Sequence, residues 1–441
     1  MGSLVNDVID LFRGHPNPGL LPMDALTAAS AAVMADPKIQ ADALVYGPDE
    51  GYAPLRQHVA EWLTSFYQPP EPSPAERICI TGGASQNLAC ILQVYTDPVY
   101  TRNVWMVAPT YFLACRMMDD AGFTGRMRAI PEDESGIDLA YLRRELIASE
   151  AKAVEEGNLK PTHKPSRPWG KVYKHLIYAI PTFSNPATRT MSLSEREQLV
   201  RLAREFDALI ITDDVYDFLQ WSPDPTQQLP APGRACQPRL VDVDRYLDGG
   251  PRDEWGHTVS NGSFSKLIGP GTRTGWAEGT EKMAWGISQA GSTRSGGAPS
   301  HLAAAIIDQL FPTGVFQQYL EKSLQPMYSR RYHRLMDAIR EHLLPLGVTL
   351  PPQPKVAGGY FIWAQLPAPL SANTLAPISL QAHGVKVATG GIFQVQGDPS
   401  SDQAGLDRYI RLCFAWEDEG RLTEGVRRLA CAMLEILEKS V

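Results

Sequence analysis

The sequence lacks any stretch that would place the chain in or across a membrane. No run of residues approaches the roughly 18 consecutive apolar side chains that a membrane-spanning helix needs. Residues 1–12 contain no basic segment followed by an apolar core, so no secretory leader is predicted. The opening Met-Gly-Ser-Leu-Val-Asn lacks the Ser or Thr that a myristoylation signal carries at its sixth position. These absences predict a cytoplasmic protein with no membrane partner.

The sequence also has few cysteines and no net positive charge. The six cysteines include no C-x-x-C pair and no histidine at the spacing of metal ligands, which argues against a zinc site and a disulfide framework. We therefore expect reduced thiols and no bound metal. Lys and Arg number 41 against 49 Asp and Glu, a formal net charge of −8. Because nucleic-acid binding needs a basic surface, no nucleic-acid partner is expected.

Apolar runs alternate with helical patterns through most of the 441 residues, which exceed the length that one core usually serves. Short runs at 77–81, 104–108, 175–180 and 208–212 are rich in β-branched or aromatic residues and end at turn residues, which predicts strands. Between them, amphipathic patterns such as 85–95 and 194–206 predict helices. The alternation predicts an α/β fold whose mostly parallel sheet is covered on both faces.

The two ends of the chain differ from this central pattern. Proline and glycine interrupt residues 1–45, which we interpret as an N-terminal arm that belongs to a smaller domain. We place a large domain at 46–310 and a small α+β domain at 311–441, which ends in a helix over 421–439. Two stretches, 151–171 and 222–255, are predicted to be surface insertions.

The motif S-N-G-S-F-S-K (260–266) carries the strongest local signal. A lysine on a short polar turn among small residues can be approached closely by a ligand. Ser263, three residues before Lys266, and Arg273, seven residues after it, can together clamp a phosphate. The combination suits a phosphorylated aldehyde. Taken alone, the same turn also fits a solvated loop with an ordinary surface lysine.

The motif T-D-D-V-Y (212–216) follows an apolar run, at the strand end where ligands of open α/β sheets collect. A buried aspartate beside a pyridine nitrogen would favour the protonated ring by charge pairing. Tyr216 can donate a hydrogen bond to a phenolic oxygen. The alternatives are a solvated acidic turn, or a magnesium site built on the two aspartates.

Two further motifs follow predicted strands. In F-S-N-P (183–186) the Asn185 side chain can donate to an oxygen while the proline stiffens the turn. In T-G-G-A-S-Q (81–86) the chain enters a helix through small residues, and the free N–H groups of such a helix start form an anion site. This motif differs from a nucleotide P-loop, because it lacks the G-K-[ST] ending.

Together the motifs resemble a known family. The order Y-G-P-D-E-G-Y (46–52), T-G-G-A-S-Q (81–86), A-P-T-Y (108–111), S-N-P (184–186), D-D-V-Y (213–216), S-F-S-K (263–266) with Arg273, and R-L-C-F (411–414) is similar to that of class I/II aminotransferases of pyridoxal 5′-phosphate (PLP) fold type I. The resemblance implies a large domain with a mostly parallel seven-stranded sheet flanked by helices, and a smaller α+β C-terminal domain. It also implies a homodimer with shared active sites.

The resemblance assigns roles to the matching positions. Lys266 would hold PLP as a Schiff base and move the substrate proton, and Asp213 would pair with the pyridine nitrogen. Tyr216 and Asn185 would hold the phenolic oxygen, and Tyr111 would stack on the ring. The remaining contacts would come from Ala84, Ser85, Ser263 and Arg273 to the phosphate, from Tyr46 to the phosphate of the partner subunit, and from Arg411, Asn185 and Gly14 to the substrate carboxylate.

Two motifs depart from the family pattern. The usual N-P-T-G turn is Asn185-Pro-Ala-Thr188, so the glycine of the turn is missing. The usual Ser-Gln after the glycines of the phosphate loop is Ala84-Ser85, which would move one phosphate contact from a side chain to the backbone.

The implied activity is a ping-pong transamination between an amino acid and a 2-oxoacid. A PLP-dependent β-lyase that cleaves a carbon–sulfur bond is the enzymatic alternative, and a ligand-sensing regulator fused to a DNA-binding domain is the non-enzymatic one. Arg294 offers a site for a side-chain carboxylate, or lies in a solvated loop. Aromatic or large hydrophobic substrates are favoured by a group of aromatic residues predicted to line the pocket: Phe12, Phe183, Tyr360, Phe361, Trp363 and Trp416.

Overall fold

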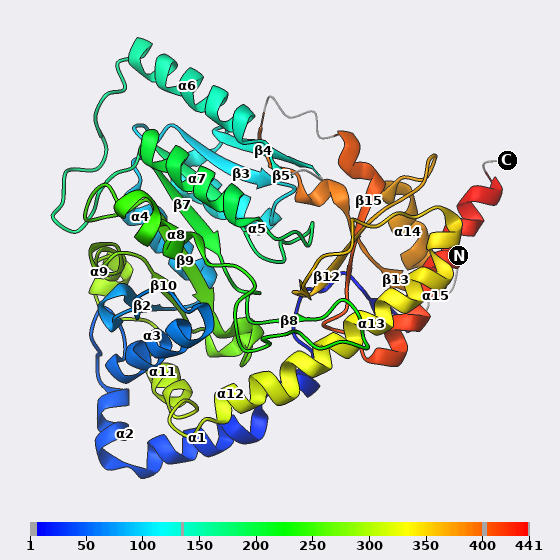
Figure 1. Ribbon diagram of the computed structural model, residues 1–441, viewed down its shortest axis with the longest axis horizontal. Coiled ribbons are helices and arrows are strands. Elements are labelled where there is room, and N and C mark those ends of the chain that lie inside the picture. The colour runs from blue at the N-terminus through cyan, green and yellow to red at the C-terminus, as the bar shows by residue number, and fades with distance from the viewer. Residues whose placement is uncertain (1–6, 134–135, 399–403, 440–441) are drawn as a thin grey trace.

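The computed structural model describes residues 7–133, 136–398 and 404–439 (Figure 1). Its centre is a sheet of eight strands in the order β2-β10-β9-β7-β6-β3-β4-β5. The run from β9 to β4 is parallel, and β10 is antiparallel to both of its neighbours. The strands are β2 (Ile78–Thr81), β3 (Asn103–Ala108), β4 (Met127–Asp133), β5 (Gly136–Ile137), β6 (His175–Ala179), β7 (Ala208–Asp213), β9 (Thr258–Ser263) and β10 (Gly275–Glu278).

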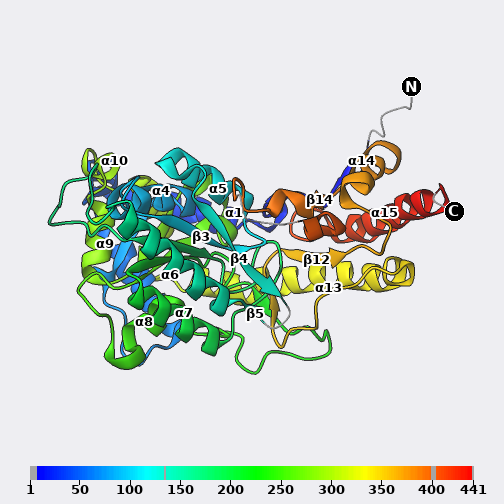
Figure 2. The ribbon, with the colours of Figure 1, turned by 90° about the horizontal axis from the view of Figure 1, so that it is seen from above.

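The mostly parallel α/β architecture predicted from the sequence is confirmed, with one strand more than the expected seven. The additional strand, β5, contributes only two residues and pairs antiparallel with the end of β4. Helices α6 (Leu139–Glu155), α7 (Leu193–Glu205) and α8 (Leu240–Tyr246) cover one face of the sheet. Helices α4 (Ala84–Tyr95) and α5 (Phe112–Met118) lie on the other face (Figure 2). Because both faces are covered, β6 and β7 are buried along their whole length.

Strand β9 corrects the interpretation of residues 260–266 as a polar turn. All six residues of Thr258–Ser263 are buried, although none is a typical core residue except Val259. Their polar groups have partners in the interior: Asn261 Nδ2 donates to Ala84 O at 3.0 Å, and Asn87 Nδ2 donates to Asn261 Oδ1 at 2.9 Å. These hydrogen bonds remove the cost of burying amides, so a polar segment forms a central strand. A single 3-10 turn, Phe264–Lys266, follows it.

The C-terminal part forms a second, smaller layer. Strands β12 (Phe361–Gln365), β14 (Ala388–Thr389) and β15 (Tyr409–Cys413) make an antiparallel sheet. Helices α13 (Gln325–His342), α14 (Ala372–His383) and α15 (Glu419–Lys439) pack with it. The N-terminal arm joins this layer, because β1 (Ile9–Asp10) pairs with β13 (Val385–Lys386). The domain boundaries at 45/46 and 310/311 stay a prediction.

The remaining elements connect these layers. Helices α1 (Met23–Ala35) and α2 (Pro37–Leu44) pack on α11 (His301–Asp308), and strands β8 (Gln220–Trp221) and β11 (Ala357–Gly358) pair with each other. The other helices are α3 (Ala53–Tyr67), α9 (Glu281–Ser288), α10 (Gly291–Arg294) and α12 (Val315–Tyr319). Within the described ranges, no helix combines the length and the apolar character needed to cross a membrane.

The two predicted insertions are only partly surface loops. The first begins inside α6, which continues to Glu155. The second contains α8, and its Arg239 is among the largest fully buried side chains. Both stretches therefore contribute to the core, which their Pro-rich and charged sequences do not indicate.

Candidate active site

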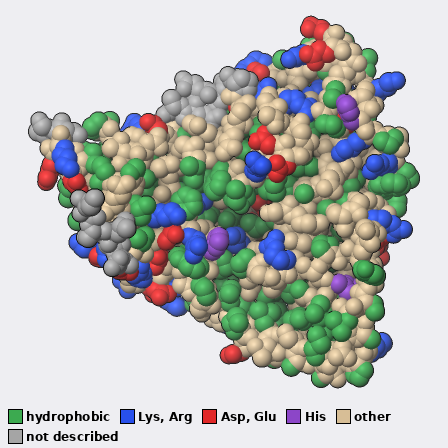
Figure 3. All heavy atoms as spheres, turned by 180° about the vertical axis from the view of Figure 1, so that it is seen from behind, with side chains coloured by type: hydrophobic (Ala, Val, Ile, Leu, Met, Phe, Trp, Pro, Cys, Tyr) green, Lys and Arg blue, Asp and Glu red, His purple; other side chains and the backbone are tan. Residues whose placement is uncertain are grey.

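A cavity of about 460 Å³ lies where the carboxyl ends of β7 and β9 meet the N-terminal arm. Figure 3 shows the face on which basic side chains and a histidine gather around an apolar hollow. The loops that follow parallel strands converge at this edge of the sheet, as is usual for open α/β folds. Of the twelve residues predicted from the family resemblance to contact cofactor or substrate, eleven line the cavity: Gly14, Ala84, Ser85, Tyr111, Asn185, Asp213, Tyr216, Ser263, Lys266, Arg273 and Arg411. Tyr46 does not, and its side chain is 89% exposed.

Lys266 places its amine inside this cavity. Its Nζ donates to the carbonyl oxygen of Gly14 at 2.9 Å and lies 5.2 Å from the ring centroid of Tyr360. Burial, which disfavours the charged form, lowers the pKa of Lys266 to about 8, and the positive charge of Arg411 adds to the effect. A substantial fraction of this amine is therefore neutral near pH 8, as a nucleophile or a base must be.

Asp213 ends β7 and presents one free oxygen to the cavity. Its Oδ2 accepts a hydrogen bond from the Tyr178 hydroxyl at 3.0 Å, whereas Oδ1 is buried and has no partner among the described residues. Burial raises the pKa of Asp213 to about 7. A buried carboxylate oxygen without a donor is costly unless a ligand supplies one. The site therefore fits a ring nitrogen that carries a proton and a positive charge.

The N-terminus of α4 forms the opposite end of the cavity. Gly83, which precedes the helix, has φ +92°, and no side chain caps the first N–H groups. A Cβ on Gly83 would lie 3.2 Å from Arg273 Nη2, so glycine keeps this loop open. Arg273 itself donates to Gly82 O at 3.1 Å. Free N–H groups, the helix dipole and a guanidinium together fit a phosphate.

Arg411 is buried beside the arm without a carboxylate partner among the described residues. Its Nη1 donates to Asn185 Oδ1 and its Nη2 to Phe12 O, both at 2.7 Å, while the buried Nε makes no hydrogen bond. The guanidinium carbon lies 3.9 Å from the ring centroid of Phe361. Gly14 allows this packing, because a Cβ there would lie 2.8 Å from Phe361 Cζ. A buried guanidinium without a counter-ion fits the carboxylate of a ligand.

Two tyrosines complete the wall around Lys266. Burial raises the pKa of Tyr216 far above its usual value, and it raises the pKa of the half-buried Tyr111 to about 12. Both phenols therefore stay protonated and can donate hydrogen bonds at neutral pH. The negative charge of Asp213 contributes to both shifts after burial.

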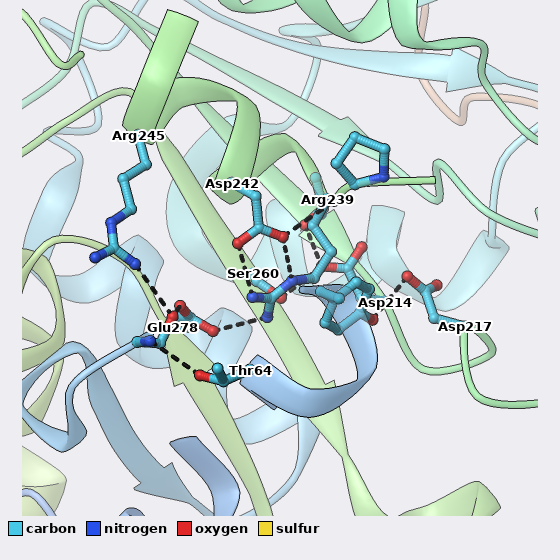
Figure 4. Close-up of polar contacts among 12 residues, drawn as sticks. Thr64, Asp214, Asp217, Arg239, Asp242, Arg245, Ser260 and Glu278 are labelled. Carbon is cyan, nitrogen blue, oxygen red and sulfur yellow. Dashed lines mark hydrogen bonds and ion pairs between the residues drawn. The ribbon is translucent and has the colours of Figure 1, made fainter. Parts of the chain in front are cut away.

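Asp214, the neighbour of Asp213 in the chain, lies beside a buried ionic network around Arg239 (Figure 4). Arg239 pairs with Asp242 through Nε and Oδ2 at 3.0 Å, and with Glu278 through Nη1 and Oε2 at 2.7 Å. Asp214 accepts hydrogen bonds from the hydroxyls of Thr212 and Ser260. Asp214 therefore faces away from the cavity, which only Asp213 of the two neighbouring aspartates lines. Across the described ranges, no cluster of side chains suits a metal ion.

The sequence also led to residues that the structure places elsewhere. Of the six aromatic residues predicted to line the pocket, only Phe12 and Phe361 do so. Arg294 pairs with Asp49 outside the cavity. Tyr178 also lines the cavity, but it lies within the apolar run of β6, where no sequence motif indicates it. Four further lining residues belong to no motif: Arg13, Phe112, Leu113 and Lys386.

Known proteins share this fold and sequence. The family described as aminotransferase class I and II matches residues 17–429. An uncharacterized protein of Saccharomyces cerevisiae is 36% identical over 406 residues, which cover 88% of this chain and 89% of that protein. Aromatic-amino-acid aminotransferase 1 of Thermococcus litoralis is 27% identical over 437 residues, 98% of this chain and 90% of that protein.

Solved structures of aminotransferases share this fold. The crystal structure of Pyrococcus horikoshii kynurenine aminotransferase, in complex with PMP, superposes with a TM-score of 0.76 at 26% identity and covers 98% of this chain and 92% of that one. The predicted fold type, cofactor and enzyme class are thereby confirmed. The chain belongs to the class I and II aminotransferases, as a PLP-dependent transaminase that acts on amino acids and 2-oxoacids.

Proposed function

We propose that the donor substrate of this aminotransferase is an aromatic or other large hydrophobic amino acid. One observation carries the proposal: the cavity that contains Lys266 and Arg411 has an apolar wall of Phe12, Phe112 and Phe361. An apolar side chain that extends from the α-carboxylate site would meet this wall and leave water. The relatives named for aromatic amino acids and kynurenine support the same substrate class.

We assign the cofactor contacts by the chemistry of each group. Asp213 would pair with the ring nitrogen through its free Oδ1, and Tyr216 and Asn185 would hold the phenolic oxygen. Tyr111 would stack on the ring. The N–H groups of Ala84 and Ser85 would hold the phosphate together with Ser263 and Arg273.

The bound cofactor supplies an electron sink for the pair left when the Cα–H bond of the amino acid breaks. Lys266 takes that proton on Nζ, and its lowered pKa keeps the amine available as a base. Arg411 and Gly14 hold the α-carboxylate, with Asn185 fixing the guanidinium from the other side. These contacts orient the Cα–H bond toward Nζ, so less entropy is lost when the reactive geometry forms.

We also propose a homodimer in which Tyr46 reaches the phosphate site of the partner subunit. Tyr46 is 89% exposed, and its neighbours Leu44 and Val45 are 59% and 61% exposed. Three consecutive exposed apolar residues favour an interface. The six cysteines are all free, which favours a reducing compartment, the cytoplasm.

The test is a substrate panel on the purified enzyme. We expect a visible absorbance from the lysine–cofactor linkage that is lost in Lys266→Ala. The control is Lys322→Ala, which should keep the absorbance because Lys322 is exposed and does not line the cavity. With 2-oxoglutarate as acceptor, phenylalanine, tyrosine or kynurenine should react faster than alanine. A preference for alanine would contradict the substrate proposal. Ammonia release without any 2-oxoacid would instead indicate a β-lyase.

A further inference from the structure

Asn261 lies at the junction of the three parts of the proposed cofactor site. It is 1% exposed and lines the cavity, five residues before Lys266 in the chain. In the sheet it pairs with Asp213 of β7, and its carbonyl oxygen accepts a hydrogen bond from Asp214 N at 3.1 Å. Its side chain reaches the first residue of α4, where Nδ2 donates to Ala84 O at 3.0 Å. One residue therefore links the strand that leads to the lysine, the aspartate at the end of β7 and the N-terminus of α4.

The hydrogen bond to Ala84 O also orients an N–H group. The peptide group between Ala84 and Ser85 is trans and planar, so its carbonyl and its N–H point in opposite directions. Asn261 Nδ2 holds the carbonyl, and the N–H at the other end belongs to Ser85, one of the proposed phosphate contacts. A donor on the carbonyl also polarises the peptide group, which makes its N–H a stronger donor.

Asn87, in the first turn of α4, fixes the orientation of the Asn261 side chain. Its Nδ2 donates to Asn261 Oδ1 at 2.9 Å, which leaves Asn261 Nδ2 to donate to Ala84 O. Both side chains are buried, and Asn87 Oδ1 has no hydrogen-bond partner among the described residues. A buried oxygen without a donor costs stability, and an apolar pair of the same shape would avoid that cost. Stability alone therefore does not account for two asparagines at these positions.

The anion site at the N-terminus of α4 depends on the direction of its backbone donors. Ala84 carries no polar group, and no side chain caps the first N–H groups of the helix. Arg273 supplies positive charge, yet it also donates to Gly82 O at 3.1 Å and to Pro270 O at 2.9 Å. Backbone N–H groups bind an anion well when they converge on it. The orientation of the Ser85 N–H therefore matters for phosphate binding.

We propose that Asn261, oriented by Asn87, is a positioning residue for the phosphate of the cofactor. It acts through the Ala84–Ser85 peptide, whose N–H it holds in one direction, and it compensates for the hydroxyl that Ala84 lacks. Because Asn261 also pairs with Asp213, the phosphate contacts and the partner of the ring nitrogen are held at a fixed separation. The proposal rests on the phosphate site proposed above, and it adds two residues that act on that site indirectly.

The first experiment compares PLP with pyridoxal, which lacks the phosphate, as ligands of the whole chain freed of cofactor. Asn261→Leu copies the branched shape of asparagine without its amide. We expect it to weaken PLP binding about tenfold and pyridoxal binding less than about twofold, in titrations that follow the absorbance of the lysine–cofactor linkage. Asn103→Leu is the matched control, because Asn103 also donates one hydrogen bond and accepts one, but outside the cavity. An equal loss for both ligands, or no loss for PLP, overturns the proposal.

A double variant separates positioning from folding. Asn87→Leu combined with Asn261→Leu replaces both partners by apolar groups, a change that can be nearly neutral for stability. We expect this variant to keep the midpoint of thermal unfolding of the cofactor-free chain and yet to show the same loss of PLP affinity. Adding Ala84→Ser returns a hydroxyl to the N-terminus of α4 and should recover PLP affinity by about threefold. A loss of PLP affinity that only follows a loss of folded protein, or no recovery with Ala84→Ser, contradicts the positioning role.

Inorganic phosphate separates a failure of the positioning role from a failure of the phosphate site. By calorimetry, the cofactor-free chain should bind phosphate, and both Arg273→Gln and Asn261→Leu should weaken this binding about tenfold. If Arg273→Gln weakens it and Asn261→Leu does not, the phosphate site stands and the positioning role is wrong. If neither variant changes the phosphate affinity, the phosphate site itself is wrong and the positioning role fails with it. Neither result depends on which amino donor the enzyme prefers.

Discussion

Thr188 occupies the position of the glycine that the N-P-T-G turn usually carries, and it keeps a glycine-like backbone. Its φ is +60°, its N–H donates to Ser184 O at 2.7 Å, and its hydroxyl makes no hydrogen bond within the described part of the chain. A β-branched residue in the left-handed region is strained. Thr188 therefore adopts a left-handed conformation that favours glycine, at a cost in stability.

We predict that Thr188→Gly raises the free energy of unfolding by about 1 kcal/mol, because it removes the clash of Cβ in the left-handed region. Urea denaturation of the purified protein measures this change. Thr188→Ala is the control, since alanine retains the Cβ and should not produce the gain. Equal stabilisation by both substitutions would place the strain in the side chain beyond Cβ.

Tyr178 is the one described partner of the carboxylate that we pair with the cofactor ring. Its hydroxyl bond to Asp213 lowers the pKa of Asp213 against the larger effect of burial, which raises it to about 7. In Tyr178→Phe that opposing contribution is lost, so the pKa of Asp213 rises. The ionised form, which stabilises the protonated ring, then appears only at higher pH.

We therefore expect the acid limb of the pH profile of kcat/KM to move to higher pH in Tyr178→Phe, with about a tenfold lower value at pH 7. Initial rates from pH 5 to 9, measured over amino donor concentrations that extend well below KM, give this profile. Tyr95→Phe is the matched control, since Tyr95 is equally buried and donates to Met283 O at 2.7 Å outside the cavity. A profile of Tyr178→Phe that keeps its shape and only drops in height would point to a purely structural role.

The sequence predicts elements well where apolar periodicity is strong. The runs at 104–108 and 208–212 lie within β3 and β7, which extend one residue further. Strand β9 could not be predicted, because its residues are mostly polar and gain their burial from partners 174 and 177 residues away in sequence. The same holds for the site. Sequence motifs predict Lys266 and Asp213, whereas the contact of Tyr178 with Asp213 depends on the pairing of β6 with β7 in the sheet.

The buried network around Arg239 joins α8 to strand β10, which lies on the far side of β9 from β7. Arg239 contacts Asp242 and Glu278 and stacks on Tyr67 at 4.1 Å from the ring centroid. Both carboxylates are nearly inaccessible to water. A partner left alone in such a site keeps its charge out of water without compensation.

We predict that Arg239→Met lowers the free energy of unfolding by about 3–5 kcal/mol. The measurement is guanidinium denaturation of the PLP-loaded enzyme, followed by far-UV circular dichroism. Arg143→Met is the control, because Arg143 forms a bidentate pair with Glu205 on the surface and should change stability little. A small effect of Arg239→Met would mean that water reaches the two carboxylates, or that a shifted arginine such as Arg77 replaces the lost charge.

The N-terminal arm and the small C-terminal layer meet at the cavity, and this arrangement depends on the whole molecule. Strand β1 pairs with β13, and the segment that follows it reaches Lys266 and Arg411 through Gly14 and Phe12. After this segment the chain continues into α1 and α2, and the exposed Tyr46 that follows them does not line its own cavity. This exposure supports the proposed contact between Tyr46 and a partner subunit.

Mixed dimers test this arrangement. If Tyr46 serves the partner subunit, a Lys266→Ala subunit paired with a Tyr46→Ala subunit contains one intact site, with Lys266 from one chain and Tyr46 from the other. The purified hybrid should then regain about half of the wild-type activity, whereas the Lys266→Ala homodimer has none. The Tyr46→Ala homodimer should bind PLP about tenfold to a hundredfold more weakly, since a hydrogen bond to a charged phosphate is lost. If Tyr46 acts in its own subunit, the hybrid holds no intact site, and its activity at limiting PLP stays at the level of the Tyr46→Ala subunit alone.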